Sequence, residues 1–320
     1  TQYTNYGDGN HFTGFMNDNT AQYPKRGQPY QGIVNRLLVN GYPELSTGGA
    51  IANVNSSNQS LQYLFDSSQI TDGNYVVKQA WMNVGGLLQQ DDKGYYYFTS
   101  SQAGSNSSSS TAQYLASYAV FNNATNQFIV YDDWALYHKN AKTGGSPDFN
   151  GQFFPFDRLS DWVNQYTDDD HNIQQTKSTY KINHYLGLDL TSRFIQRYNG
   201  KSFFDSNEDM IFEFSGDDDI WVFVDDVLVA DLGGLHIRLD FKINFATGEV
   251  TYTVLDKNGR TNDIKINGQT INTTIYDMFA AAGKTGSVDW QTATTAATKV
   301  FDTGSSGGKN QIFKDNTAHT

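Results

Sequence analysis

Short apolar runs broken by turn residues constrain the fold of this chain more than any other feature. Runs such as MIFEFSG, DIWVFVDD and VLVADLG are only a few residues long and are separated by Gly, Asn, Asp and Ser. They are rich in the β-branched and aromatic residues that favour strands. Helical periodicity is limited to IVNRLLVN near residue 35 and TIYDMFAAAGK near residue 279. The sequence therefore predicts an all-β protein, an antiparallel β-sandwich with long loops and one or two short helices.

The charge and cysteine content exclude several classes of protein. The formal net charge is −12, and only four of the 34 acidic residues are Glu, so Asp dominates, which suits turns and hard-cation ligation better than helices. A surface this acidic repels phosphate backbones, so we expect no nucleic-acid partner. With no cysteine there are no disulfides, thiolate metal sites or cysteine nucleophiles. No apolar run is long enough for membrane insertion.

Three consecutive aspartates precede the most apolar part of the chain. Asp217, Asp218 and Asp219 follow the permissive Gly216 and lead into IWVFV, which is apolar on both faces and reads as a strand buried on two sides. Asp225 and the following Asp supply a tight turn, after which VLVAD returns as the partner strand. The triplet therefore lies where a loop enters a core strand.

Two interpretations of the triplet remain open at this stage. Adjacent side chains on a regular strand face opposite sides, so Asp217 and Asp218 grip one ion only if the backbone between them is irregular. A cis peptide there would cost about 3–4 kcal/mol, which a bound divalent cation can offset. Short anionic oxygen ligands favour Ca²⁺ over zinc or copper. The alternative is a solvated turn, because Asp is common in turns.

The string FSGDDDIWVFVDDVLVADLGGLH, followed by INFATGEV, resembles the signature of the fibro-slime domain, a branch of the protective-antigen-type lectin β-sandwiches found in Gram-positive surface adhesins. Further pieces of the likeness are LQYLFDSS, VGGLLQQDDKGYYYFTS, FIVYDDW, GQFFPF and NHYLGLDLTSRFIQ. Together they cover most of the chain from about residue 61 onward. Residues 1–45 resemble nothing in that family.

The resemblance implies a β-sandwich with Ca²⁺ held at one tip by Asp217 and Asp218, joined through a cis peptide. Asp219 falls where many relatives have Gly, so its role as a ligand, a sugar contact or a surface charge stays open. The remaining signature positions are implied to be structural: Gly216, Trp221, Asp225, Asp231, Gly233, Gly234 and His236. Members of the family bind glycans by letting sugar hydroxyls complete the coordination of the ion.

The expected function follows from the resemblance. It is a non-enzymatic, Ca²⁺-dependent carbohydrate-binding adhesin domain that attaches a bacterial surface protein to host or matrix glycans. We expect an extracellular, monomeric fragment of a larger cell-wall-anchored protein. The expected domains are an N-terminal segment, 1–45, packed on the sandwich, and one elaborated β-sandwich, 46–320, with its signature core at 181–320. The alternatives are a calcium-stapled stalk module or a binder of a protein or matrix ligand.

Other candidate sites have plainer explanations. Asp91-Asp92 could form a second metal loop, but a hairpin turn closed by Asp-Asp-Lys-Gly explains them with nothing bound and is the favoured interpretation. The six His show no metal-ligand spacing, and a structural hydrogen bond is the favoured role of His236. A glycoside hydrolase is the rival enzyme class, but it requires two carboxylates flanking a bond, whereas adjacent aspartates are better placed to share an ion.

Overall fold

The computed structural model describes the following parts of the chain: 2–3, 29–46, 60–66, 77–79, 81–99, 111–139, 153, 155–156, 186–216, 218–234, 236, 238–256, 259–266, 268–295 and 311–320. The chain divides into two compact units. Unit 1 comprises Thr1–Asn5 and Val77–Leu188, and unit 2 comprises Tyr6–Val76 and Asp189–Thr320. The domain boundaries expected from the sequence stay a prediction.

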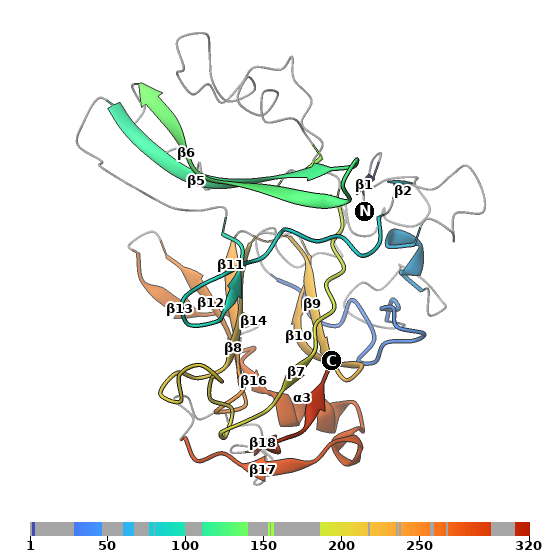
Figure 1. Cartoon of the computed structure of the whole chain (residues 1–320). Coiled ribbons are helices and arrows are strands. Elements are labelled where there is room, and N and C mark those ends of the chain that lie inside the picture. The colour runs from blue at the N-terminus through green and yellow to red at the C-terminus, as the bar shows by residue number, and fades with distance from the viewer. Residues whose placement is uncertain are drawn as a thin grey trace. The chain divides into compact units, whose positions relative to one another are not determined.

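Unit 1 is built from antiparallel strand pairs. They are β1 (Gln2–Tyr3) with β2 (Val77–Gln79), β3 (Gln89–Gln90) with β4 (Tyr96–Tyr97), and the long hairpin of β5 (Thr111–Asn122) and β6 (Gln127–Lys139) seen in Figure 1. Aromatic rings pack at the turn end of this hairpin. Trp81 stacks on Phe156 at 5.1 Å between ring centroids, and Phe121 meets Phe128 edge-on at 5.5 Å.

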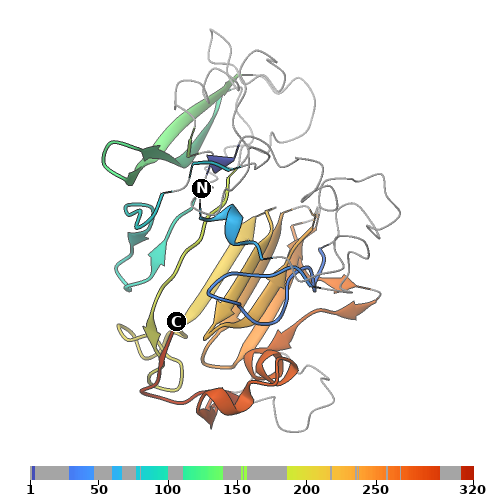
Figure 2. The same cartoon turned by 90° about the vertical axis from the view of Figure 1, so that its right-hand side faces the viewer.

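The main sheet of unit 2 is antiparallel, and its strands run side by side in Figure 2. Its order is β13 (Thr261–Asp263), β12 (Glu249–Leu255), β11 (Leu239–Asn244) and β8 (Ile211–Gly216), with β16 (Thr273–Thr274) also pairing with β12. Alternation of buried and exposed residues along β11 shows that one face of this sheet is turned to the core.

A second layer of unit 2 is the hairpin of β9 (Ile220–Val224) and β10 (Val227–Leu232). Its apolar side chains join those of β11 and β12 in one hydrophobic cluster, which Phe279 closes from α3 (Ile275–Ala281). The remaining short elements are η1 (Gln62–Leu64), β7 (Phe194–Ile195) with β19 (Ala318–His319), β14 (Lys265–Ile266) with β15 (Gln269–Thr270), η3 (Thr285–Ser287), and β17 (Trp290–Thr292) with β18 (Gln311–Phe313). The prediction of an all-β, antiparallel fold is confirmed.

The helix predicted near residue 279 is present as α3, whereas the one predicted near residue 35 is wrong. Residues 29–46 instead run along the edge of β10, with bridges from Tyr30 to Gly233 and from Leu37 to Val227. The apolar residues of this segment are compatible with a helix or with an extended chain. The free edge of β10 favours the extended chain, because it offers backbone hydrogen bonds. For this reason every residue of β10 is buried, while β9, which the sequence indicates to be buried on both faces, is mostly half-buried.

Within the described ranges, no helix is both long enough and apolar enough to span a membrane.

Candidate functional site

The turn between β9 and β10 is built by two aspartates. Asp225 and Asp226 both have positive φ, 48° and 65°. Two successive left-handed residues are what a tight two-residue hairpin turn requires, and Asp tolerates that conformation better than most residues. The turn predicted from the sequence is confirmed, and it lies at the opposite end of the hairpin from Asp219.

At that opposite end, three carboxylates form what we call the acidic rim: Asp218, Asp219 and Asp231. Asp231 lies on β10 opposite Trp221, and the residue is only 4% exposed. One carboxylate oxygen, Oδ2, accepts the backbone N–H of Gly32 at 2.6 Å. The other, Oδ1, is buried and has no hydrogen-bond partner among the described residues. Burial raises the pKa of Asp231 to about 6, although the N–H groups of Gly32 and Trp221 pull it down.

Asp219 belongs to the same rim. The residue as a whole is exposed, but its carboxyl is packed against Gly233 and Gly234 and accepts the Gly234 N–H. Desolvation there raises the pKa of Asp219 to about 7, and the charges of Asp218 and Asp231 raise it further against the effect of that N–H. Two neighbouring carboxyls thus bind protons near neutral pH.

The glycines of the signature explain how residues 29–46 approach the hairpin. A Cβ on Gly233 would lie 2.6 Å from Cδ1 of Ile33, and one on Gly234, at φ 88°, would lie 2.6 Å from Cδ2 of Tyr30. Any larger residue at either position would therefore push this segment away. Gly216 ends β8 opposite Leu239, and His236 is buried, so both lie within the fold rather than on a free surface.

The predicted calcium pair lies only partly within the described residues. Asp217 and the peptide bonds that it forms, including the expected cis bond, lie outside the described residues, and Asp218 is exposed. In the part of the chain that is described, no three His, Asp or Glu side chains are grouped so that they could hold a metal ion. The Asp217 and Asp218 site and its Ca²⁺ stay a prediction. Asp91, by contrast, accepts the N–H groups of Lys93 and Tyr95, as a turn residue does.

The raised pKa values predict that the protein is more stable in mild acid. Between the unfolded pKa near 4 and the folded values near 6 and 7, the native state binds more protons than the unfolded chain. The free energy of unfolding therefore falls as the pH rises through that window, with Asp231 alone contributing on the order of 1 kcal/mol between about pH 5 and pH 8. Chemical denaturation across this range measures the effect.

The matched variant is Asp231→Asn, which keeps the shape of the side chain and removes its titration. It should make the pH profile of stability shallower, because only Asp219 of the two groups would still titrate in this range. A wild-type protein that is equally stable or more stable at the alkaline end would contradict the assignment of these protons.

A second network, at the C-terminal strand, has no counterpart among the features predicted from the sequence. His319 is buried, its Nδ1 lies 2.6 Å from Oδ2 of Asp225, and its Nε2 lies 2.7 Å from Oγ1 of Thr317. Its ring stacks on Phe313 at 4.0 Å between centroids. Asp225 also accepts the N–H of Thr320 at 3.0 Å, so the turn carboxylate anchors the last strand. The last strand is held on one side by the pairing of β19 with β7 and at the turn by the N–H of Asp225, which donates to the carbonyl oxygen of Thr320 at 2.7 Å.

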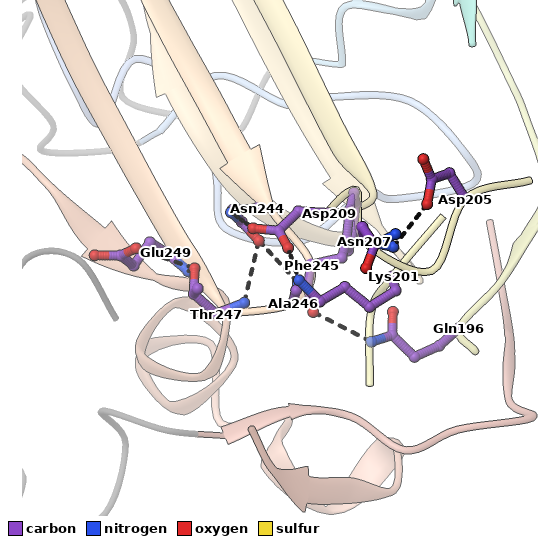
Figure 3. A network of polar contacts seen from close by, with 10 residues as sticks. All are labelled: Gln196, Lys201, Asp205, Asn207, Asp209, Asn244, Phe245, Ala246, Thr247 and Glu249. Carbon is purple, nitrogen blue, oxygen red and sulfur yellow. Dashed lines mark hydrogen bonds and ion pairs between the residues drawn. The ribbon is translucent and has the colours of Figure 1, made fainter. Parts of the chain in front are cut away.

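A third network, shown in Figure 3, joins Lys201, Asp209 and Asn244. Asp209 forms an ion pair with Lys201 and accepts a hydrogen bond from Nδ2 of Asn244 at 2.7 Å. The sequence offers only a faint signal for it, an Asn at the end of a predicted strand. The three residues belong to separate segments that the tertiary structure brings together.

Comparisons with known proteins give partial matches. No protein-family model matches the chain, and no solved structure matches it. Curated relatives include psi proteins of Dictyostelium discoideum. Protein psiF is 32% identical over 110 residues, covering 33% of this chain and 14% of psiF. Protein psiK is 38% identical over 99 residues, 30% of this chain and 12% of psiK, and psiI is 36% identical over 108 residues, 34% of this chain and 13% of psiI. The chain spans well under two thirds of the length of these relatives.

These findings correct the identification made from the sequence. The relatives are eukaryotic psi proteins rather than bacterial fibro-slime adhesins, so that identification is wrong, as is the function derived from it, a calcium-dependent lectin adhesin of a bacterial cell wall. The physical reason is that the matched string encodes a hairpin. Its Asp-Asp turn and its Gly-Gly contact are required by backbone geometry, which specifies no ligand. The expectations about partners, localisation and the absence of enzymatic activity stay predictions.

Proposed function

We propose that this chain is a non-enzymatic recognition module of a larger protein, and that two carboxylates of its acidic rim, Asp219 and Asp231, take up a hard divalent cation without a third carboxylate ligand. The observation that carries the proposal is the carboxylate of Asp231, which is buried and has one oxygen, Oδ1, without a hydrogen-bond partner among the described residues.

A buried carboxylate oxygen without a partner is costly, so such groups normally bind a proton or a cation. Asp219 lies close enough for its pKa to be raised by the charge of Asp231. Desolvation opposes ionisation of both groups, and the charge of Asp231 also opposes that of Asp219, whereas the charge of Arg36 partly favours ionised Asp231. A cation that enters beside the two carboxylates relieves the desolvation of both and the repulsion felt by Asp219. Oxygen ligands alone suit Ca²⁺ or Mg²⁺, and the ion predicted from the sequence, Ca²⁺, is the first probe.

Binding fits this rim better than catalysis does. Asp231 has one oxygen held by the Gly32 N–H and the other enclosed by protein, so neither reaches a substrate bond. Its environment instead ties residues 29–46 to β10, and Gln31 adds a hydrogen bond from its side-chain amide to the carbonyl oxygen of Asp231 at 3.2 Å. The support for a module is that the psi relatives match over only 12–14% of their own length.

The main competing explanation involves Trp221. Its indole N–H lies close enough to lower the pKa of Asp231, yet Nε1 is buried and forms no hydrogen bond with any described residue. A hydrogen bond requires alignment as well as proximity. A small rotation that closes this bond would satisfy Oδ1 without any cation.

The experiment is a thermal melt of the purified chain at about pH 8, where both carboxylates of the rim are ionised, with Ca²⁺, with Mg²⁺ and with a chelator. We expect one of the two ions to raise the melting temperature in wild type but not in Asp231→Asn. Asp289→Asn is the control, because it removes a carboxylate whose side chain is 72% exposed and lies outside the rim.

Equal melting temperatures with either ion and with chelator would overturn the cation site. If Asp231→Asn then also destabilised the protein without any ion, the role of this carboxylate would be structural, through its contacts with Gly32 and Trp221. A cation shift that Asp231→Asn retains would assign the ion to other residues.

A further inference from the structure

The network of Lys201, Asp209 and Asn244 places an amine, a carboxylate and an amide in hydrogen-bonded sequence. Asp209 shares its two carboxylate oxygens, with Oδ1 to the ammonium of Lys201 and Oδ2 to the side-chain N–H of Asn244. The amine and the amide nitrogen therefore both lie within hydrogen-bonding reach of one carboxylate. Asp209 is thus placed to exchange protons with both nitrogens.

The amide carbonyl of Asn244 is held by two backbone donors. Its Oδ1 accepts the N–H of Ala246 at 2.9 Å and that of Thr247 at 3.1 Å, as Figure 3 shows. Two converging N–H groups polarise the carbonyl and stabilise negative charge that develops on its oxygen during attack on the carbon. The two backbone donors come from the turn that follows Asn244, as in an ordinary Asx turn, and the feature that such a turn does not require is the Asp209 carboxylate on Nδ2.

The backbone fixes all three residues. Lys201 and Asp209 form a bridge, Met210 donates its N–H to the carbonyl oxygen of Gly200 at 2.8 Å, and Phe245 donates to that of Met210 at 3.0 Å. These backbone hydrogen bonds connect three segments: the one that carries Lys201, the residues that lead into β8, and the end of β11. The side chains of Lys201 and Asp209 are 22% and 27% exposed, above the buried Phe245 and Gln196, so the cluster is only partly open to water.

From this geometry we infer that Lys201 and Asn244 form an intramolecular amide crosslink, with Asp209 as the proton carrier. Asp209 takes a proton from the Lys201 ammonium, and the free amine attacks Cγ of Asn244. The new bond joins Nζ to Cγ, and the bond from Cγ to Nδ2 breaks. Protons given up by Nζ pass through Asp209 to the departing nitrogen, which leaves as ammonium. No oxidant, reductant or cofactor takes part, and the product is lighter by one ammonia.

The ion pair opposes the first proton transfer. Burial raises the pKa of Asp209, but the hydrogen bonds from Lys201 and Asn244 and the charges of Lys201 and Lys242 outweigh it and hold that pKa below its usual value. Crosslinking is therefore expected to continue after folding. A polar cavity lined by Asn207, Glu208, Asp209, Ile211, Lys242 and Asn244 gives the ammonium a way out.

The crosslink would close the loop between Lys201 and Asn244. A covalent closure restricts the unfolded chain and so stabilises the native state, as a disulfide does, in a chain that has no cysteine. It would also keep the entry to β8 attached to the end of β11 when the chain is pulled.

The test is the intact mass of the purified chain under denaturing conditions, measured at once and after incubation at neutral pH, followed by proteolysis. We expect a growing fraction to lose the mass of one ammonia and to yield a branched peptide that joins the segments containing Lys201 and Asn244. Wild type that keeps its full mass throughout would overturn the inference.

Two variants identify the chemistry. Lys201→Arg keeps the charge opposite Asp209 but supplies no amine that can form the amide, so both the mass loss and the branched peptide should disappear. An ammonia loss that persists in Lys201→Arg would instead indicate cyclisation of Asn244 onto its own backbone and would also overturn the inference. Lys242→Arg is the control, because Lys242 lines the same cavity but pairs with Glu213. It should leave the crosslink intact, and circular dichroism confirms that each variant is folded.

Discussion

Gly200→Ala is expected to destabilise unit 2 by more than about 3 kcal/mol, which combines backbone strain of about 1–2 kcal/mol with the cost of overpacking. Gly200 has φ 73°, where residues with a Cβ are strained, and a Cβ placed there would lie 2.2 Å from the carbonyl oxygen of Phe245 and 2.5 Å from the nitrogen of Ala246. Both contacts are with backbone atoms that cannot rotate away. Urea denaturation of wild type and variant measures the difference.

Gly259→Ala provides the matched control for this prediction. Gly259 has nearly the same φ, 72°, but no atom lies within 4 Å of the position that its Cβ would take. The substitution Gly259→Ala should therefore lower the free energy of unfolding only by the backbone strain, about 1 kcal/mol. Equal effects of the two substitutions would show that strain alone matters and that the contact between Gly200 and Phe245 is looser than described.

The close contact at Gly200 also bears on the proposed crosslink. Gly200 precedes Lys201, and Phe245 follows Asn244. A side chain at Gly200 would push apart the two segments that carry the amine and the amide. Any folded fraction of Gly200→Ala should therefore form less of the crosslinked product than wild type does.

Phe279→Ala is expected to destabilise the protein by about 3–5 kcal/mol, the usual cost of removing a large aromatic side chain from a core. Phe279 is fully buried, and its ring meets those of Trp290 and Phe313 edge-on at 5.3 Å and 5.6 Å between centroids. These contacts fix α3 and β18 against the hydrophobic cluster of the hairpin and the main sheet. Thermal or urea unfolding, followed by tryptophan fluorescence, measures the loss.

Tyr276→Ala is the control on the same helix. Tyr276 is half-buried and also contacts Trp290 edge-on, at 5.0 Å, but it lies outside the central cluster. Its removal should cost clearly less than that of Phe279. If the two variants lose similar stability, α3 is held by its contact with Trp290 rather than by the core.

The relation between sequence and structure differs between the two predicted helices. In α3 the local signals agree, because Thr274 accepts the N–H of Asp277 at 3.0 Å and donates to its carboxylate at 2.8 Å, closing the N-terminal turn. Residues 33–40 carry a similar apolar pattern without such a cap. There the exposed edge of β10 offered hydrogen bonds that a separate helix could not supply, and the extended form was favoured.

The candidate sites show the same division. The triplet from Asp217 to Asp219 and the turn at Asp225 stand out in the sequence because their chemistry is local. The surroundings of Asp231 could not be predicted from the sequence, and its structural role stays a prediction. Its Oδ1 is buried and has no hydrogen-bond partner in the described parts of the chain, and its Oδ2 accepts the N–H of Gly32, from a segment about two hundred residues away.

The sequence by itself determined the strands, the hairpin turn and the absence of disulfides, because alternation, left-handed turn residues and cysteine count act within a few neighbouring residues. Only the tertiary structure decided which polar groups meet. The pairing of His319 with Asp225, and the convergence of Lys201 and Asn244 on Asp209, depend on strand register and close backbone approach between distant segments. The free energy that selects those contacts is shared over the whole core, so no short stretch of sequence records it.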